Sequence, residues 1–443
     1  MLLTIEKLIY GGDGLTHLPA DVQGRAKAVF VPFVLAGEKI EASLIEQKTS
    51  FTRARADSIV ESSPQRIAPA CPYFSQCGGC HYQQATYEHQ LEIKKEILRE
   101  TLRRTARLEL PCEIEVHPSP PWNYRNRSRL QLWTQPAFAT GYFKHASHEL
   151  LPVAQCPISS PLINRALATL WQSGRAGKVP EGIREIEFFA NADDTRLLAE
   201  LYCVPDCRRA AVRPWAEDLR GAMPEITGVV AFRKSRSRAP HAPDKLLSLG
   251  ADHLIYHTQR ADYRVSAGSF FQTNRFMTDE LVRIVTEGRS GALALDLYAG
   301  AGLFSTALAR FEHVVSVESS QTSTGDLAYN RSANGEVVQA TTEQYLAQAE
   351  NAGRAGKGIV LPHTLHPPDL AVVDPPRSGL GERVARLLAS LGAPRIAYVS
   401  CDPATLARDL VPLLAAGYRV EQVHLVDLFP QTFHLESVVH LTR

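Results

Sequence analysis

The residues Leu293–Gly302, with the sequence LALDLYAGAG, decide the fold of the C-terminal part of this chain. A short apolar run that contains Asp296 predicts a buried strand. Gly300 and Gly302 then predict a tight turn into a helix near Ser305. Similar apolar segments follow at residues 314–318, 370–374 and 395–400, separated by helical patterns. This alternation predicts an α/β domain with a doubly wound parallel sheet over residues 263–443.

The rest of the chain predicts two further domains. Several short alternating segments within residues 1–62, separated by turn residues, predict a β-barrel of the OB type, and a plain β module that docks on the rest of the chain explains them equally well. Residues 63–262 mix strand and helix patterns and are interpreted as an α+β domain. One long helix, over about 87–110, is expected to pack on the C-terminal domain. Residues 354–368 are interpreted as a loop insertion.

Composition excludes several classes of protein. The 443 residues carry a formal net charge of only +1, so no global positive field indicates a polyanionic partner. We find no apolar run of the roughly 18 residues that a transmembrane helix needs, and the start of the chain lacks the pattern of a signal peptide. Eight cysteines in a chain of this length are too sparse for a secreted disulfide framework. We therefore expect a cytoplasmic monomer.

A carboxylate at a second strand end predicts the cofactor. Ligands of doubly wound sheets bind beyond the carboxyl ends of the strands, and Glu318 ends the next strand, where it would accept hydrogen bonds from ribose hydroxyls. Ser305 stands where a dinucleotide-binding motif has its third glycine, which favours a cofactor with a ribose but no pyrophosphate. S-adenosylmethionine fits that description. The alternative is a strand–helix turn without a ligand.

The sequence Asp374-Pro375-Pro376-Arg377 marks a third strand end. It resembles the Asn/Asp-Pro-Pro-Tyr/Phe loop of amino-group methyltransferases, in which the aromatic residue stacks on the base. Here Arg377 offers guanidinium hydrogen bonds instead. This difference argues against methylation of an exocyclic amine.

Cys401 is the candidate nucleophile. It lies in Ser400-Cys401-Asp402-Pro403, ahead of a helix predicted over about 403–413, with Asp402 as its N-cap. The positive end of that helix favours a thiolate and Asp402 opposes it, so we expect a modestly lowered tendency to hold the proton. The segment 429–436, FPQTFHLE, supplies Glu436 as a candidate base. A thiolate, a base and a methyl donor together fit methylation of uracil at carbon 5.

These motifs together resemble the RNA 5-methyluridine methyltransferases, in the branch with an N-terminal TRAM domain and an iron–sulfur cluster. The matching segments follow the family's order along nearly the whole chain: Cys71 to Cys80, Ser269 to Asn274, Asp296 to Gly302, Asp374 to Arg377, Ser400 to Pro403 and Phe429 to Glu436. The resemblance implies a Rossmann-like catalytic domain. One departure is Leu303, where some members carry a polar residue that contacts the cofactor.

The resemblance also implies roles for individual residues. Cys401 would attack carbon 6 of the base and Glu436 would remove the proton from carbon 5. The residues expected around the methyl donor are Gln272, Tyr298, Glu318 and Asp374. Phe270 is expected near the base, which must leave its stack to be reached, and Arg377 is expected to bind substrate.

A cluster of cysteines predicts a metal site. Cys71, Cys77 and Cys80 lie close together in the sequence, and the resemblance implies Cys156 as the fourth ligand of a 4Fe–4S cluster. Spacing alone leaves zinc open, held by the same four residues or with His81 in place of one of them. A metal-free group of thiols is the remaining alternative. We assign the other three to packing: Cys112, Cys203 and Cys207.

Two basic stretches with aromatic residues, 122–129 and 232–238, predict contacts with RNA phosphates. The second is equally well explained as a solvated surface. We expect an RNA substrate, ribosomal rather than transfer RNA. Two rival hypotheses are an iron–sulfur oxidoreductase and a non-catalytic RNA-binding protein. Hydride transfer by an oxidoreductase would not require Cys401 and Glu436. A non-catalytic RNA-binding protein would not require the thiol.

Overall fold

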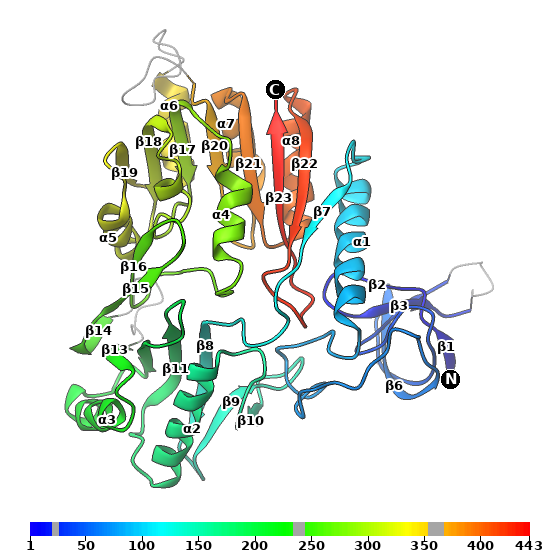
Figure 1. The fold of residues 1–443 in the computed structure, drawn as a ribbon. Coiled ribbons are helices and arrows are strands. Elements are labelled where there is room, and N and C mark those ends of the chain that lie inside the picture. Colours follow the sequence, from blue (N-terminus) through cyan, green and yellow to red (C-terminus); the bar gives the residue numbers. More distant parts are fainter. Residues whose placement is uncertain (20–25, 234–243, 353–366) are drawn as a thin grey trace.

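The computed structural model describes residues 1–19, 26–233, 244–352 and 367–443. Its strands form a six-stranded N-terminal sheet, a seven-stranded central sheet, a two-stranded hairpin and an eight-stranded C-terminal sheet (Figure 1). The predicted insertion at 354–368 and the second basic stretch lie largely outside the described residues.

The N-terminal sheet is curled (Figure 1), which is consistent with the predicted OB-type barrel, and has the strand order β1-β5-β6-β4-β3-β2. Its inward-facing apolar side chains form a small core of their own, which includes Ile5, Val31 and Ile40. The strands are β1 (Leu2–Thr4), β2 (Lys7–Leu8), β3 (Gly14–His17), β4 (Ala28–Val31), β5 (Lys39–Gln47) and β6 (Phe51–Glu61).

The central sheet has the order β10-β9-β8-β11-β12-β13-β14, and helices α2 and α3 share a core with it. Buried Cys203 and Cys207 belong to that core, as expected from their assignment to packing. The elements are β8 (Arg127–Trp133), β9 (Ala139–Phe143), β10 (Leu150–Pro152), α2 (Pro161–Arg175), β11 (Ile183–Ala190), β12 (Leu197–Cys203), α3 (Arg209–Ala222), β13 (Ile226–Arg233) and β14 (Asp244–Gly250). The hairpin β15 (His253–His257) and β16 (Asp262–Ser266) follows.

The C-terminal sheet has the order β19-β18-β17-β20-β21-β23-β22-β7. The five adjacent strands β19, β18, β17, β20 and β21 run parallel to one another. Strand β23 is antiparallel to both of its neighbours, β21 and β22. The strands are β7 (Ile114–His117), β17 (Gly291–Leu297), β18 (Phe311–Glu318), β19 (Gly335–Gln339), β20 (Leu370–Val373), β21 (Arg395–Ser400), β22 (Arg419–Val426) and β23 (Glu436–Thr442). The predicted doubly wound α/β fold is confirmed.

Alternation along the strands gives the sheet a core on each face. In β17, Leu293, Leu295 and Leu297 point to the core shared with α1, α6, α7 and α8, while Ala294 faces the core shared with α4. Figure 1 shows α4 on one side of the sheet, and α1 runs beside its β7 edge. The helices are α1 (Tyr87–Thr105), α4 (Thr278–Thr286), α5 (Gln321–Asn330), α6 (Thr342–Ala352), α7 (Gly381–Leu391) and α8 (Pro403–Ala415).

Two features depart from the sequence predictions. The glycine turn after β17 leads into a short 3-10 helix, Ser305–Ala307, and not into a full α-helix. The chain reaches β18 only a few residues later, which leaves no room for a longer helix. Strand β7 comes from far earlier in the chain and completes the edge of the C-terminal sheet beside β22. No helix among the described residues is long and apolar enough to cross a membrane.

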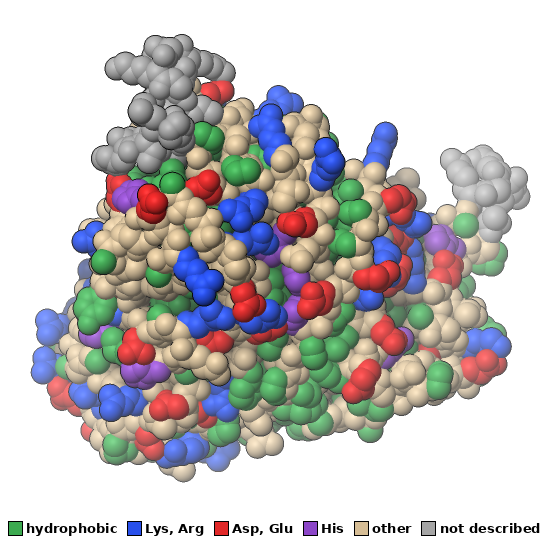
Figure 2. All heavy atoms as spheres, turned by 45° about the horizontal axis from the view of Figure 1, so that its top comes forward, with side chains coloured by type: hydrophobic (Ala, Val, Ile, Leu, Met, Phe, Trp, Pro, Cys, Tyr) green, Lys and Arg blue, Asp and Glu red, His purple; other side chains and the backbone are tan. Residues whose placement is uncertain are grey.

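The face shown in Figure 2 carries basic and acidic side chains interspersed, in keeping with the formal net charge of +1.

Candidate active site

Cys401 and Glu436 meet at one end of two paired strands. Strand β21 ends at Ser400, which pairs with Ser437 near the start of the antiparallel strand β23. The Ser437 hydroxyl also donates a hydrogen bond to the carbonyl of Ser400, 3.3 Å away. Because the strands are antiparallel, the residue after Ser400 lies across from the residue before Ser437. The candidate nucleophile and the candidate base are therefore neighbours in space.

Helix α8 begins directly after the thiol. Pro403 is its first residue, and the Asp402 side chain accepts hydrogen bonds from the backbone N–H groups of Ala404 and Thr405, at 2.9 and 3.0 Å. This is the N-cap that the sequence predicted. The cap fixes the turn that carries Cys401 out of the sheet.

The prediction of a modestly lowered tendency of Cys401 to hold its proton is wrong, because the pKa of this thiol is raised. Burial, together with the negative charges of Glu436 and Asp374, raises the pKa of Cys401 to about 12. Arg377 lowers this pKa, and Asp402 raises it further. The helix end does not outweigh desolvation and three nearby carboxylates. Their proximity was not readable from Cys401 and its sequence neighbours.

A row of interacting carboxyl groups leads away from the thiol. Burial raises the pKa of Glu436 well above its usual range, and Asp374 adds to the effect while Arg377 opposes it. Burial and the neighbouring Asp296 raise the pKa of Asp374 to about 7. The pKa of Asp296 is likewise raised to about 7, first by burial. Among the described residues, no cation lowers the pKa of Asp374 or of Asp296.

Asp296 is a site residue that the sequence analysis did not single out. It is fully buried; one carboxylate oxygen accepts a hydrogen bond from Ser305, while Oδ1 has no hydrogen-bond partner among the described residues. The signal was present in the sequence, because an acidic residue inside a buried strand requires a partner.

The loop after β17 has an unusual backbone. Tyr298, Gly300 and Gly302 all have positive φ angles, of 62°, 56° and 92°. A Cβ atom at Gly302 would lie 2.9 Å from the Leu327 side chain, so both conformation and space favour glycine there. A non-glycine residue with positive φ, such as Tyr298, is a sign of a constrained and often functional turn.

Glu318 and Tyr298 lie at the same end of the sheet. One carboxylate oxygen of Glu318 accepts the N–H of Gly300 at 3.0 Å, and the other accepts the N–H of Ser320 at 2.6 Å. Glu318 is therefore held in place but remains partly exposed. The Tyr298 hydroxyl interacts with Thr342 at the start of α6.

The segment before α4 carries Phe270 and Gln272. The Phe270 ring is 61% exposed, an unusual state for a large apolar side chain, whereas Gln272 is buried. Asn274 fixes this segment to the loop between β22 and β23, because its amide donates to the carbonyl of Leu428 at 3.0 Å. No described contact joins the Gln272 side chain to the carboxyl row.

Arg377 is exposed at the rim and faces His434, with 3.4 Å between Nη2 and Nε2. Burial and Arg377 lower the pKa of His434 to about 3, so its ring is neutral. The sequence analysis quoted His434 as part of a motif but gave it no role. His434 belongs to the loop that leads to Glu436, so this loop presents a neutral ring to Arg377.

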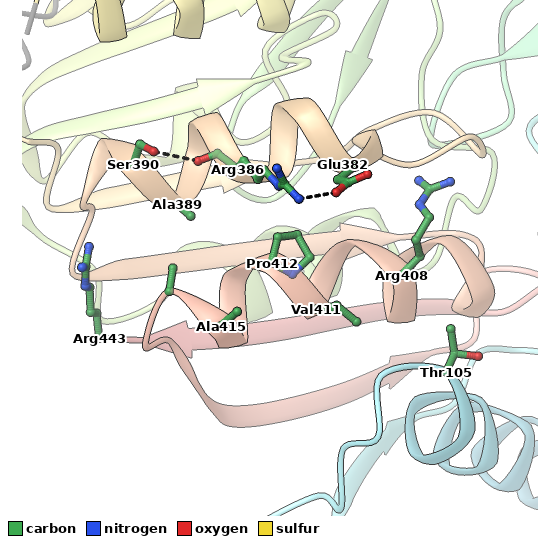
Figure 3. A pocket seen from close by; sticks show the side chains of 11 residues that line it. Thr105, Glu382, Arg386, Ala389, Ser390, Arg408, Val411, Pro412, Ala415 and Arg443 are labelled. Carbon is green, nitrogen blue, oxygen red and sulfur yellow. Dashed lines mark hydrogen bonds and ion pairs between the residues drawn. The ribbon is translucent and has the colours of Figure 1, made fainter. Parts of the chain in front are cut away.

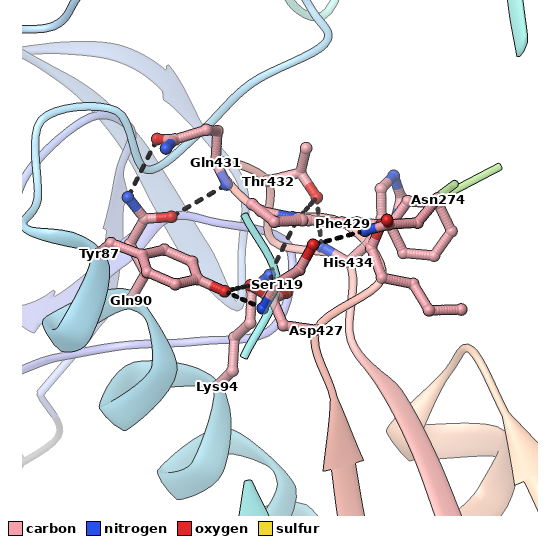
Figure 4. Close-up of polar contacts among 12 residues, drawn as sticks. Tyr87, Gln90, Lys94, Ser119, Asn274, Asp427, Phe429, Gln431, Thr432 and His434 are labelled. Atoms are coloured by element: carbon pink, nitrogen blue, oxygen red, sulfur yellow. Dashed lines mark hydrogen bonds and ion pairs between the residues drawn. The ribbon is translucent and has the colours of Figure 1, made fainter. Parts of the chain in front are cut away.

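A buried ion pair anchors this loop, which we call the catalytic loop (residues 427–435). Lys94 of α1 and Asp427 have fully buried side chains and lie 2.6 Å apart. Lys94 also donates to the carbonyl of Phe429 at 2.9 Å, and the Tyr87 hydroxyl donates to Asp427 at 2.9 Å. Figure 4 shows these groups converging on the loop from the helix.

Two amide side chains add a second anchor. The Gln90 amide donates to the Gln431 side-chain carbonyl at 3.0 Å, and Gln90 accepts the backbone N–H of Gln431 at 2.9 Å (Figure 4). Ser119, just after β7, donates its backbone N–H to the Tyr87 hydroxyl at 2.8 Å. The loop that leads to Glu436 is thus fixed by α1, which lies more than 300 residues earlier in the chain.

The N-terminal sheet also reaches the site. The Tyr10 hydroxyl donates to the carbonyl oxygen of Cys401, 3.3 Å away, and its ring contacts Phe433 edge-on at 5.4 Å between centroids. His81 contacts the same phenylalanine at 4.6 Å. The barrel was not predicted to contact the thiol.

The four predicted ligand cysteines meet although Cys156 is distant in sequence. Cys71, Cys77, Cys80 and Cys156 line one cavity of about 200 Å³. His81 does not line this cavity. Burial raises the pKa of the Cys77 thiol to about 11, and the other thiolates add to the effect. A larger hollow of about 1010 Å³ lies between α7 and α8 (Figure 3), and none of the predicted site residues lines it.

Comparisons with known proteins identify the family of this chain. A family model described as tRNA (Uracil-5-)-methyltransferase matches residues 86–443. An uncharacterized RNA methyltransferase of Aquifex aeolicus is 31% identical over 99% of this chain and 97% of its own. A 23S rRNA (uracil(1939)-C(5))-methyltransferase of Pseudomonas fluorescens Pf-5 is 30% identical, over 98% of this chain and 92% of its own.

Among solved structures, the tRNA (uracil-54, C5)-methyltransferase of Pyrococcus abyssi, in complex with S-adenosyl-L-homocysteine, is similar over the full length of both chains. Its TM-score is 0.72 at 24% sequence identity. At that identity the similarity establishes a common fold.

Proposed function

Because this chain belongs to the tRNA (uracil-5-)-methyltransferase family, we propose that it transfers a methyl group from S-adenosylmethionine to carbon 5 of a uridine in RNA. The observation that carries the mechanism is the position of Cys401 across from Glu436 at the paired ends of β21 and β23. A reaction that adds a thiolate to one ring carbon and removes a proton from the next needs these two groups side by side.

The reaction has three steps. The Cys401 thiolate bonds to carbon 6 of uracil, and the electron pair of the 5,6 double bond moves onto carbon 5 and its carbonyl. Carbon 5 then bonds to the methyl group, and the donor sulfur keeps the electrons of the broken bond and leaves as a neutral thioether. Glu436 removes the proton from carbon 5, the double bond re-forms, and the thiolate is released.

The ionisation of the two groups sets the conditions for this sequence. In the substrate-free protein Cys401 is a thiol, so its proton must leave before the attack. Glu436 must be ionised to act as the base, and Arg377 favours its charged form. Burial raises the pKa of Glu436 and repulsion from Asp374 raises it further, so additional positive charge near Asp374 would favour the ionised form of Glu436.

We assign Gln272, Tyr298, Glu318 and Asp374 to the methyl donor. S-adenosylmethionine supplies an electrophilic methyl group on a positively charged sulfur. The residues fit such a group, because among the described residues no cation lowers the pKa of Asp374 or of the fully buried Asp296, and Asp296 Oδ1 lacks a hydrogen-bond partner there. Glu318 would accept the ribose hydroxyls.

Phe270 and Arg377 would receive the base. Phe270 exposes most of its ring and offers a stacking surface to a uracil that has left its helix. Arg377 would donate hydrogen bonds to a carbonyl oxygen of the ring, where negative charge develops after attack at carbon 6.

We further propose that Cys71, Cys77, Cys80 and Cys156 hold a 4Fe–4S cluster. Tetrahedral zinc would bring its sulfur ligands to about 3.8 Å of one another, given Zn–S bonds of about 2.3 Å. Among the described residues, the one group of three or more potential ligand atoms within 4.8 Å of one another does not include these cysteines. The wider spacing favours the cluster. Methyl transfer needs no electron, so the cluster would be a structural clamp.

The RNA substrate is proposed to be ribosomal. The curled N-terminal sheet would act as a TRAM-type RNA-binding domain, and relatives that match along the chain include enzymes named for 23S rRNA. The basic stretch 122–129 would contact phosphates. A cytoplasmic, monomeric enzyme remains our expectation.

The test is a trapping experiment with RNA that contains 5-fluorouridine. Fluorine cannot leave as a proton, so the wild-type protein with S-adenosylmethionine should form a complex that survives denaturing electrophoresis. Cys401→Ala should form none, while Cys112→Ala, a half-buried cysteine elsewhere, should behave as wild type. Transcripts of 23S rRNA should be trapped in preference to tRNA. Equal trapping by Cys401→Ala would overturn the mechanism.

A further inference from the structure

A second cluster of potential metal ligands lies at the β7–β22 edge, outside the proposed active site. Glu115 and His117 are two residues apart in β7, so their side chains leave the same face of the strand. His424 in β22 is paired directly with Glu115 in the parallel ladder. All three side chains therefore share one face of two paired strands, and His117 contacts Glu280 of α4.

The distances between the potential ligand atoms are similar to those between the ligands of a tetrahedral metal ion. His117 Nε2 lies 3.0 Å from His424 Nδ1, and the Glu115 oxygens lie 3.4 Å from His424 Nδ1 and 3.7 Å from His117 Nε2. Tetrahedral zinc with bonds of about 2.0–2.2 Å separates its ligands by about 3.3–3.5 Å. The three observed separations bracket that value.

The surrounding groups support a ligand role for His117. Its second nitrogen, Nδ1, lies 2.7 Å from Glu280 of α4. Arg283 pairs with both oxygens of that carboxylate, at 2.7 and 2.8 Å. An ionised Glu280 accepts the proton of Nδ1, which leaves the lone pair of Nε2 pointing to His424 and Glu115. Histidine ligands of metals are usually oriented by a carboxylate in this way.

The exposure of one of the three side chains would let a metal ion reach the cluster from solvent. The His117 and His424 side chains are almost completely buried, whereas Glu115 is 62% exposed. Two fixed imidazoles and one accessible carboxylate leave a fourth position for water, and allow an ion to enter from solvent.

We propose that Glu115, His117 and His424 form a Zn²⁺ site, with Glu280 as the residue that orients His117. The ion would join β7 to β22 and, through Glu280, to α4. Its role is structural. The proposal does not depend on the methyltransferase activity, and the site is separate from the four cysteines.

The test measures Zn²⁺ binding by the full-length protein after removal of weakly held metal with a chelator. We expect wild type to bind one equivalent more than Glu115→Gln or His117→Gln, and to show an increase in melting temperature on Zn²⁺ addition that both variants lack. Glu280→Gln should bind this equivalent about 10–100-fold more weakly. Glu115 is exposed, so its replacement leaves the fold intact.

The matched control is His440→Gln. His440 is buried beside His424, with ring centroids 5.5 Å apart, but does not belong to the ligand group. It should keep the wild-type stoichiometry, and the cysteine site contributes equally in every variant. Titration with Co²⁺ gives a second readout, because an N/O site adds absorption bands without thiolate charge transfer. Equal Zn²⁺ stoichiometry and affinity in wild type and Glu115→Gln would overturn the proposal and leave an ordinary histidine–histidine hydrogen bond.

Discussion

At the scale of single residues, the site combines the partly buried thiol of Cys401 with the buried carboxyl groups of Glu436 and Asp296. The substrate-free protein holds protons on Cys401 and Glu436, because burial and mutual repulsion disfavour two negative charges. Arg377 is the cation that lowers both pKa values. The site is thus arranged so that charge develops on the substrate and not on the resting enzyme.

This arrangement predicts the pH dependence of the reaction. A thiol whose pKa is raised to about 12 gains thiolate as pH rises, about tenfold per pH unit below its pKa. With the methyl donor saturating, we expect kcat/KM for RNA to increase from pH 6.5 to 9. Arg377→Gln should move the profile to higher pH, because it removes the favourable cation. A profile that is flat between pH 6.5 and 9 would show that the thiolate forms without this barrier.

At the scale of elements, α1 and the catalytic loop form one unit. Lys94 and Asp427 are buried together, and the paired Gln90 and Gln431 fix the same loop. Buried ion pairs add little net stability over apolar packing, but removal of one partner is costly because the other charge remains buried. The pair therefore specifies where the loop leading to Glu436 lies.

Lys94→Met should destabilise the protein by about 3–5 kcal/mol, because it leaves the Asp427 carboxylate buried without its cation. Lys95→Met is the matched control: Lys95 is a partly exposed neighbour that pairs with exposed Glu113, and its loss should cost about 0–1 kcal/mol. Urea denaturation measures both. The double variant Lys94→Met/Asp427→Asn should recover part of the loss. A Lys94→Met protein as stable as Lys95→Met would contradict the role of the pair.

Features that depend on neighbouring residues in the sequence could be predicted, whereas contacts between distant segments could not. The strands of the C-terminal sheet and the Asp402 cap follow from local patterns and are confirmed. The helix expected after Gly302 is wrong, because β18 begins at Phe311 and the short connection has room only for a 3-10 turn. The Lys94–Asp427 pair and the contact between Tyr10 and Cys401 join distant segments. No local pattern encodes such pairs.

At the scale of the whole molecule, segments from the N-terminal and C-terminal parts of the chain meet at the proposed site. The C-terminal sheet carries Cys401 and Glu436, the N-terminal sheet contributes Tyr10, and the cysteine cavity lies between the central sheet and the loop before α1. The contact between Tyr10 and Cys401, which lie far apart in the sequence, could be found only in the structure.

We expect the four-cysteine site to hold its cluster in the purified protein. Protein purified without oxygen should carry one 4Fe–4S cluster, visible as matched iron and sulfide content. Cys156→Ser should lose the cluster and lower the melting temperature, because a ligand that joins two distant segments is removed. Cys112→Ser should retain it. Stoichiometric zinc in place of iron would contradict the assignment.

The most direct test of the central claim uses Glu436→Gln with ordinary RNA and S-adenosylmethionine. Without the base, the methylated ring keeps its proton at carbon 5 and cannot release the enzyme. Mass spectrometry of the denatured protein should find a methylated uridine joined to Cys401. Free 5-methyluridine formed at the wild-type rate, with no adduct on the cysteine, would contradict the account.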